Sequence, residues 1–470
     1  MCFFFSRRAT ALAASLVMSA CVSYDPQQGM RLSAQDTAAF TGDSLTLATT
    51  ESQRMQRAAL TRQLLNAPVG QKQAVDLMLV NSAAFQSLLA QHWALAASIA
   101  QSGRIPNPSV AIERVVTGNE TELNALLTFG LLDVLTLPQR ADLARLKLVQ
   151  AQIRLSADVV DQVTQVRQAW VRAVAANEML TYAEQVAQAA QASDTLAERM
   201  KAAGNFNALT RSRHQLFHAQ AQMQLAVAQQ NRLSRTEALV RLLGLDAQQA
   251  AQLKLPESLP ALPEHAVDIQ VAATQASQQR LDIRMAQAEL QTAAKAQGLT
   301  GVTSWTDIEL TVLSGKVSSA GSDTSRNGAQ ISIKLPVFDS GNMQRAQMNA
   351  QTLAAANQLQ ATAQQAVSTL REAHAAYLTS YSIAKRYKEE LLPLRQRIAD
   401  ENLLRYNAMQ IGVFDLLTDA AEQSNTVAAS LDALQQFWLS EAALQSTLMG
   451  RPLTTALSVN ATKGSSEAAH

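Results

Sequence analysis

Three carboxylates are spaced along the chain so that a helix would carry them on one face. Asp415, Asp419 and Glu422 lie at positions i, i+4 and i+7. The same spacing occurs earlier in the chain with neutral or basic residues, namely Asn207, Arg211 and His214. Because opposite charges on neighbouring helices attract, we expect Arg211 to pair with Asp415 or Asp419. The alternative is two separate polar faces that are both solvated.

The histidines are the next residues whose spacing suits chemistry. His214 and His218 are four residues apart, which places two metal ligands on one helix face. No third Cys, His or carboxylate ligand lies in obvious register, so these are weak candidates and we predict no metal site and no cofactor. The sequence shows no nucleophile–base pair and no phosphate loop, so we expect no enzyme. Lys plus Arg number 39 against 38 Asp plus Glu, which argues against nucleic-acid binding.

The N-terminus reads as a targeting segment. Arg7 and Arg8 precede an apolar run that ends in Ser19-Ala20-Cys21. This pattern resembles the lipobox of bacterial lipoproteins and predicts a signal peptide over 1–20, with Cys21 lipidated as the first mature residue. Acylation would anchor the chain in a membrane. The alternative is an ordinary signal peptide cut near Cys21, which would leave a free thiol.

The elements that position these residues follow one plan twice. The first half predicts a helix at 71–102, strands at 109–116 and 123–131, and a long helix from 138 to 243 that breaks near Gly204. The second half predicts a helix at 265–297, strands at 304–313 and 329–335, and a long helix from 340 to 449 that breaks near Gly412. Around these repeats, at 71–254 and 265–450, we expect an N-terminal extension at 21–70, a proline-rich linker at 255–264 and a flexible tail at 451–470.

Matching residues support a duplication. Gly204–Thr210 resembles Gly412–Thr418, since both read Gly-x-Phe-x-x-Leu-Thr, and Leu243-Gly244 resembles Met449-Gly450 at nearly the same offset. Pro393 removes one backbone donor and should kink the second long helix. The first long helix has no proline at the matching place, so the two halves should differ there.

The predicted strands alternate between apolar and polar residues. Segments 306–312 and 329–335 both show a strict period of two, which is the apolar-out, polar-in pattern of membrane strands. A soluble two-sided sheet is the alternative. Four strands cannot close a barrel in lipid without exposed edges, so we expect an oligomer. The first long helix, about 65 residues before its break, would span about 100 Å, which suits a tube or a coiled coil.

Several motifs together resemble those of TolC-like outer-membrane efflux proteins, in the lipoprotein branch of that family. They are Lys334–Gly341 with Arg345-Ala346, Arg280–Ile283 with Ala286 and Glu289, Asn107-Pro108, and the paired Gly-x-Phe-x-x-Leu turns. The resemblance covers 71–450. One departure is Leu137-Pro138-Gln139, where the family usually has a glycine.

The resemblance implies a mainly α-helical fold with a membrane β-barrel. Each subunit of a homotrimer would give four strands to a twelve-stranded barrel and long helices to a periplasmic tunnel. The tips would meet a periplasmic adaptor protein through Gly204, Asn205, Phe206, Gly412, Val413 and Phe414. Asn207, Arg211, Asp415, Asp419 and Glu422 are candidates for the closed aperture. An inner-membrane pump would supply the energy, and the channel would conduct passively across the outer membrane, in contact with its lipid.

Other functions stay open at this point. A lipid-anchored periplasmic coiled-coil scaffold would need the helices but no pore, and the alternating strands argue against it. A duct for type I protein secretion would have the same fold. The cargo is equally open between drugs, metal ions and proteins.

Overall fold

We describe a computed structural model of the chain over residues 26–41, 45–118, 120–202, 208–266, 280–319 and 322–452. The predicted signal peptide with Cys21, the first turn at Gly204, Asn205, Phe206 and Asn207, and most of the C-terminal tail lie outside these ranges. No helix in the described ranges is both long enough and apolar enough to cross a membrane.

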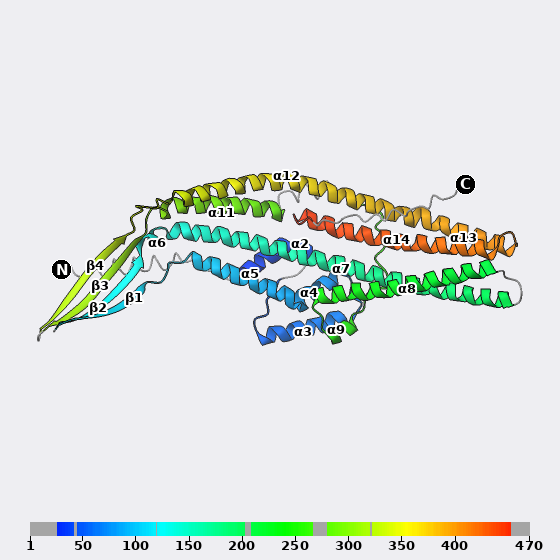
Figure 1. Cartoon of the computed structure of the whole chain (residues 1–470), viewed down its shortest axis with the longest axis horizontal. Coiled ribbons are helices and arrows are strands. Elements are labelled where there is room, and N and C mark those ends of the chain that lie inside the picture. The colour runs from blue at the N-terminus through cyan, green and yellow to red at the C-terminus, as the bar shows by residue number, and fades with distance from the viewer. Residues whose placement is uncertain are drawn as a thin grey trace. The chain divides into compact units, whose positions relative to one another are not determined.

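The first half of the chain begins with helices and continues into two strands and a long helical pair (Figure 1). Its elements are α2 (Pro26–Thr41), α3 (Glu51–Leu65), α4 (Gln71–Asn81), α5 (Ala83–Ser102), β1 (Ser109–Thr117), β2 (Glu120–Gly130), α6 (Leu131–Leu135), α7 (Leu137–Ala202), α8 (Ala208–Leu243) and α9 (Ala247–Gln252). The second half repeats the plan with α11 (Leu281–Thr303), β3 (Ile308–Ser319), β4 (Ser322–Ile333), α12 (Asn342–Arg386), the π-helical turn η1 (Tyr387–Leu391), α13 (Leu392–Asn407) and α14 (Val413–Leu448). The expected order of helix, two strands and interrupted long helix is present in both halves.

Two compact units are each built from both halves of the sequence. One comprises the described residues of Met1–Ser33 together with Leu89–Ser156 and Leu281–Gln365, and it contains all four strands. The other comprises Ala34–Leu88, Ala157–Arg280 and Ala366–His470, again for their described residues, and it contains both helical hairpin ends. The duplicated segments therefore meet within each unit instead of folding as separate repeats.

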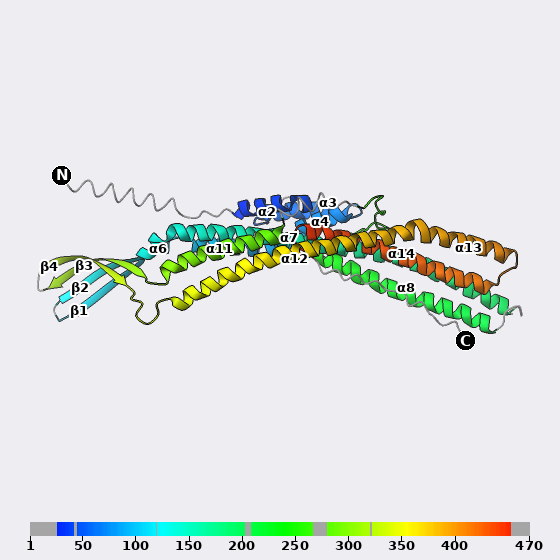
Figure 2. The same ribbon diagram turned by 90° about the horizontal axis from the view of Figure 1, so that it is seen from above.

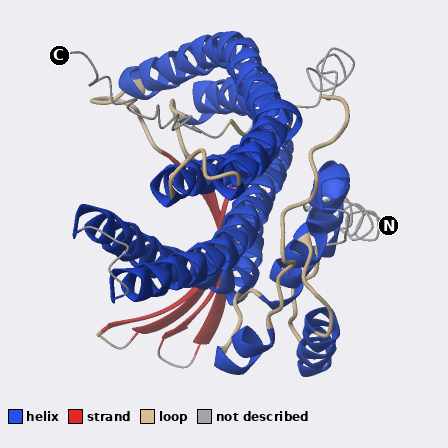
Figure 3. Ribbon diagram, turned by 90° about the vertical axis from the view of Figure 1, so that its right-hand side faces the viewer, coloured by secondary structure: helices blue, strands red, loops and turns tan. Residues whose placement is uncertain are grey.

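The strands form one antiparallel sheet, which is red in Figure 3. Their order in the sheet is β1-β2-β3-β4. The central pair joins the two halves, with Leu127 opposite Val312 and Phe129 opposite Leu310. The β3–β4 hairpin is longer than expected and includes the polar stretch from Ser314 to Asn327. The alternation of apolar and polar residues could not predict that stretch. It is held in the sheet by backbone pairing and has no apolar face.

The single helix expected at 71–102 is two helices, so that prediction was wrong. Ser82 leaves the helical conformation at ψ 118° and ends α4, and its hydroxyl accepts a hydrogen bond from Phe85 N–H at 3.4 Å. Asn81 then donates to the carbonyl of Gly244 at 2.7 Å. The break thus attaches the end of α4 to the end of α8, a contact between residues 163 positions apart.

Gly244 and Gly450 have the same structural role at the ends of α8 and α14. Both have a positive φ, of 66° and 82°, and each lies just past a helix whose last carbonyls it helps to satisfy. At Gly244 an added Cβ would also approach the Ser82 Cα to 2.7 Å. The repeated dipeptide found in the sequence is therefore a repeated helix stop that favours glycine.

The second long helix is interrupted just before Pro393, at the place where a kink was predicted. Leu392 N–H donates to the Tyr387 carbonyl, five residues back, and forms the π-helical turn η1. Because proline has no N–H to donate, the chain can add one residue here and restart as α13 with Pro393 in its first turn. In the first half, α7 runs without interruption from Leu137 to Ala202.

The unit that contains both hairpin ends is called the helical unit below. Its core includes an aromatic cluster on α12 and α14. Phe437 lies 5.5 Å from Tyr377 and 5.8 Å from Tyr381, measured between ring centroids. The Tyr381 hydroxyl donates to the Glu264 carbonyl at 2.7 Å, and Trp438 donates to that of Pro260 at 3.0 Å. The proline-rich linker is therefore held against the helices by their aromatic side chains.

Candidate functional site

The first hairpin end, formed by α7 and α8, contains a partly buried ion pair. Arg211 Nη1 lies 3.3 Å from Asp194 Oδ1 and donates to the Asp194 carbonyl at 3.1 Å. Arg211 Nη2 lies 3.7 Å from Glu198. Within the chain, therefore, Arg211 pairs across its own hairpin with α7 and not with the expected Asp415 or Asp419.

The two histidines belong to the same cluster on α8. His214 is buried, and its Nδ1 lies 3.0 Å from the Ser193 hydroxyl. Burial lowers the pKa of His214, and the nearby Arg211 lowers it further, whereas Asp194 acts in the opposite direction. His218 Nδ1 lies 3.7 Å from Asp194 Oδ2. The residues around these rings make a hydrogen-bonded helix contact, and in the described ranges no group of three or more metal-ligating side chains is present.

The second hairpin end, formed by α13 and α14, contains an ion pair with the positions exchanged. Arg395 on α13 lies 3.5 Å from Asp419 and also pairs with Glu422, both on α14 (Figure 2 shows these helices side by side). Asp419 is buried at 8% exposure. Two of the three predicted acidic residues thus share one cation from the preceding helix.

Asp415 has a different role from the other two carboxylates. Its Oδ2 accepts the Gly412 N–H at 3.1 Å, which caps the first turn of α14. Gly412 itself has a φ of −85°, which any residue can adopt. Val413 and Phe414 are the first two residues of α14.

Met409 takes the positive φ at this tip, and no pattern in the sequence indicated it. Its φ is 57°, and it is the one non-glycine residue of the described chain in that region. Met409 N–H donates to the Tyr406 carbonyl at 2.9 Å and Gln410 N–H to that of Arg405 at 2.9 Å, which closes the end of α13. The side chain is 94% exposed. A strained, fully exposed apolar residue at a hairpin tip is a candidate contact for a partner.

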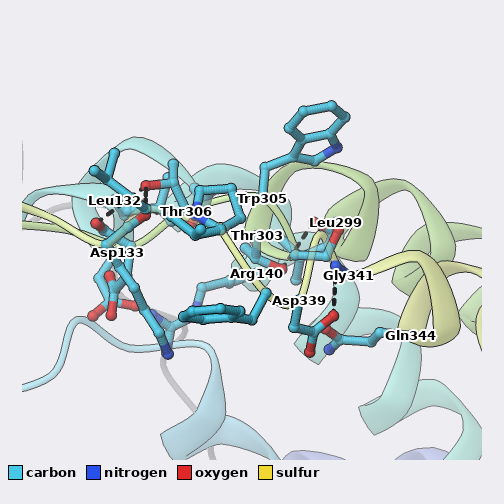
Figure 4. Close-up of a pocket in the computed structure, with 18 residues that line it drawn as sticks. Leu132, Asp133, Arg140, Leu299, Thr303, Trp305, Thr306, Asp339, Gly341 and Gln344 are labelled. Atoms are coloured by element: carbon cyan, nitrogen blue, oxygen red, sulfur yellow. Dashed lines mark hydrogen bonds and ion pairs between the residues drawn. The ribbon is translucent and has the colours of Figure 1, made fainter.

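A polar cavity of about 690 Å³ lies where the strands meet the helices (Figure 4). Asp133 and Arg140 line it from the first half, and Trp305, Phe338 and Asp339 from the second. Asp339 accepts the Gly341 N–H at 2.8 Å, and Trp305 projects away from the other labelled side chains. The Lys334–Gly341 motif noted in the sequence forms one wall of this corner.

An arginine fastens each strand-to-helix corner. Arg140, near the start of α7, pairs with Asp133 and donates to the carbonyls of Ser102 and Arg104 at 3.3 Å each. Arg345, near the start of α12, donates to Ser304 Oγ at 2.9 Å and lies 5.1 Å from the Trp305 ring centroid. The duplication therefore extends to these corners, including the first one, where Leu137-Pro138-Gln139 departs from the family pattern.

On its two central strands, β2 and β3, the sheet exposes apolar side chains and buries polar ones. Its apolar face carries Val110, Ile112, Leu123, Leu127, Phe129, Ile308, Leu310, Val312, Ile331 and Ile333. Ile112 is 76% exposed and Ile331 61%. On the opposite face Asn124 and Thr311 are buried, and the Thr128 and Thr311 hydroxyls lie 2.9 Å apart. This is the reverse of the distribution that a water-soluble sheet needs.

Comparison with solved structures gives the same architecture. A membrane protein from Pseudomonas aeruginosa matches at a TM-score of 0.68 with 20% identity, covering 83% of this chain and 93% of the other. The Campylobacter jejuni CmeC outer membrane channel matches at 0.66 with 15% identity, covering 88% and 90%. The outer membrane protein VceC from Vibrio cholerae matches at 0.63 with 16% identity, covering 84% and 96%.

The chain has the fold of a TolC-like outer-membrane channel. The mainly α-helical fold with four strands per chain, expected from the motifs, is thereby confirmed. No protein-family model matches the chain, and no curated protein matches it in sequence.

Proposed function

We propose that the chain is one subunit of a trimeric outer-membrane export channel. Three copies would close twelve strands into a barrel, with the helices forming a periplasmic tunnel. The channel would passively conduct small molecules or metal ions delivered by an inner-membrane pump and a periplasmic adaptor. The observation that carries the proposal is the sheet face on which Val110, Ile112, Ile331 and Ile333 are all more than half exposed. Such a face needs lipid, and the outer strands β1 and β4 each leave one edge to pair with a neighbouring copy.

The experiment combines membrane fractionation with conductance. We expect the full chain in outer-membrane fractions as a heat-resistant trimer that forms pores in planar bilayers. Ile112→Lys places a charge on the apolar face and should lower insertion, since a lipid-facing Lys costs about 2–4 kcal/mol at the bilayer midplane. The matched control is Ala111→Lys, on the opposite face of the same strand. A monomer without conductance would favour the non-porous scaffold, and equal insertion of both variants would contradict the assigned lipid face.

We propose that the hairpin tips bind the periplasmic adaptor. Gly204, Asn205, Phe206, Gly412, Val413 and Phe414 are the residues expected from the family resemblance. Met409 joins them because of its exposure at the tip. Met409→Asp should reduce the amount of adaptor that co-purifies with the assembled pump. Met55→Asp, at a methionine on α3 that is 63% exposed, is the matched control and should not.

We propose that the same ends form the closed aperture, through Asn207, Arg211, Asp415, Asp419 and Glu422. The support is that Arg211 and Asp419 each fasten one hairpin, so each fixes the spacing of two tunnel helices. Arg211→Ala and Asp419→Ala trimers should show raised conductance in planar bilayers. Unchanged closure in both variants would remove these residues from the aperture.

We also propose that Cys21 is lipidated and anchors the mature chain in the outer membrane. The support is the sequence pattern before it. Palmitate labelling should be present in the wild type and absent in Cys21→Ser. A wild-type chain that carries a free thiol at Cys21 would contradict the anchor without affecting the channel.

A further inference from the structure

A continuous groove runs between three helices of the helical unit, away from the hairpin tips. Two adjoining cavities, of about 390 Å³ and 180 Å³, share Met179, Ala228 and Asn231 in their walls. Along α7 the lining extends from Arg172 to Val186, which is about 21 Å at 1.5 Å per residue. The other walls come from α8 and α14. The combined space is of the size that holds a small ligand.

The larger cavity is apolar over most of its length. Its lining includes Met179, Tyr182, Val186, Met223 and Val227. Met223 is 66% exposed and Val227 57%, so apolar side chains line an open groove in the single chain. Alanines on all three helices keep the groove open, since Ala183, Ala228 and Ala428 present only a methyl group. Flexible methionines beside small residues suit a linear apolar chain.

The smaller cavity, at one end of the groove, contains two arginines. Arg172 comes from α7 and Arg235 from α8. Burial, and then the nearby Arg235 guanidinium, lower the pKa of Arg172. The third ionisable residue there is Asp432, which is exposed, and its one negative charge against two guanidinium groups leaves the cavity with an excess of positive charge. Two like charges that repel each other at the end of an apolar groove create a site for an anion.

We propose that this groove binds an anionic amphiphile, with its acidic head between Arg172 and Arg235 and its apolar tail along Met179, Val186 and Met223. The chemical class is a single carboxylate, sulfate or phosphate on a linear chain of about twelve carbons, which is shorter than the groove. The excess positive charge of the smaller cavity favours an anionic head group over an uncharged or a cationic one. The ligand could come from the bilayer or from solution. The site does not depend on the proposed channel function, because binding is measured without any conductance.

The test uses the full-length protein in phosphatidylcholine nanodiscs. Binding of dodecanoate, dodecyltrimethylammonium and dodecyl maltoside is measured below the concentration at which each forms micelles. We expect preferential binding of dodecanoate. Arg172→Gln and Arg235→Gln should each weaken it about tenfold, the effect of losing one charge-assisted contact. Arg232→Gln on α8, an exposed arginine outside the groove, is the matched control and should bind as the wild type does.

Further variants separate the site from general partition into the nanodisc. Met223→Asp places a charge in the tail groove and should weaken dodecanoate binding while leaving both arginines in place. Equal binding of all three head groups would overturn the proposal, and so would wild-type affinity in both arginine variants. Absence of any dodecanoate binding would also overturn it and point to a partner helix as the occupant. Competition by phosphatidylglycerol would identify a lipid source, and its failure a soluble one; either result supports the site.

Discussion

Each of the two hairpin ends contains an ion pair between its antiparallel helices. The helix that carries the arginine and the helix that carries the carboxylate are exchanged between the two ends. In the first, the cation Arg211 follows the turn and its partner Asp194 precedes it. In the second, the cation Arg395 precedes the turn, and Asp419 and Glu422 follow it. Each hairpin therefore has one arginine against carboxylates of the antiparallel helix. The comparison teaches that duplication kept the contact, although the residue types at matching positions became opposite.

The hairpins also differ in what surrounds that contact. The first has the buried His214 beside its ion pair, and the second has the strained Met409 at its tip. The second also follows the π-helical turn, whereas α7 is continuous. We therefore expect the first hairpin to respond to protons and the backbone of the second to relax when Met409 is replaced.

The largest expected effect is from Arg211→Ala. It leaves Asp194 without its cation in a site where both side chains are at most 20% exposed, so we expect a loss of about 2–3 kcal/mol in the local stability of the first hairpin. Arg395→Ala also leaves the buried Asp419 without its cation, but it should cost less, about 1–2 kcal/mol, because Arg395 is itself 26% exposed and its second partner Glu422 is largely solvated. Hydrogen exchange of α8 and α14 measures both. The exchanged pair Asp194→Arg with Arg211→Asp should restore the first hairpin, and a failure to do so would mean that packing, not charge, holds it.

Gly244→Ala should destabilise the first half by about 2 kcal/mol. The added Cβ meets the Ser82 backbone at 2.7 Å and forces a positive φ on alanine. The thermal midpoint of the assembled protein measures the loss. Gly298→Ala is the control, because no atom lies within 4 Å of its added Cβ and alanine favours the helix. Equal midpoints for both variants would contradict the close approach of α4 and α8.

A change of opposite sign is expected at the second tip. Met409→Gly relieves the positive φ of 57° and should stabilise the end of α13 by about 0.5–1 kcal/mol, the strain less the added chain entropy. Slower hydrogen exchange at residues 404–410 would report it. Destabilisation would show that the exposed methionine packs against a neighbour in the assembled channel.

The smallest effect is a pH dependence confined to the first hairpin. Because burial lowers the pKa of His214 from its ordinary value near 6.5, the unfolded hairpin takes up the proton first as pH falls. Neutral His214 therefore stabilises the folded hairpin at pH values above the ordinary pKa. This stabilisation is lost as the pH falls toward the lowered pKa. The protection factors of the α8 amides, which correct exchange for its intrinsic pH dependence, should therefore fall between about pH 7.5 and 5.5, and His214→Gln should remove that fall. The same fall in α13 would show a cause unrelated to His214.

The sequence predicted the duplicated order of elements because periodicity and turn residues are local properties. The disruption at Pro393 follows from a single residue with a strong conformational preference, whereas at the second tip Met409, and not Gly412, takes the positive φ. The break at Ser82 could not be predicted, since the residue that meets it, Gly244, is distant in the chain and is bound by Asn81. Local pattern carries no information about that neighbour.

The ion pairs show the same limit within the candidate site. Matching positions across the repeat led to the expectation of a bond between Arg211 and the acids after Gly412. The actual partners lie 17 and 27 positions away on antiparallel helices, for Arg211 with Asp194 and Arg395 with Glu422. Hairpin geometry decides these pairs. Met409 was missed for a related reason, because methionine has no turn preference and the cap at 405–410 assigns it the positive φ.

The turn at Tyr387–Leu391 also sets the rotational phase of everything that follows it. An α-helix advances 100° per residue, so one residue absorbed in a wider turn changes by about that angle the direction in which later side chains point. Arg395 lies one helical turn after this segment. The rotation that the extra residue adds brings its side chain to face Asp419. Deleting one residue from the turn would leave composition and charge almost unchanged. It would nevertheless rotate the arginine out of reach of α14, so the angular position of this hairpin is encoded upstream of the contact that closes it.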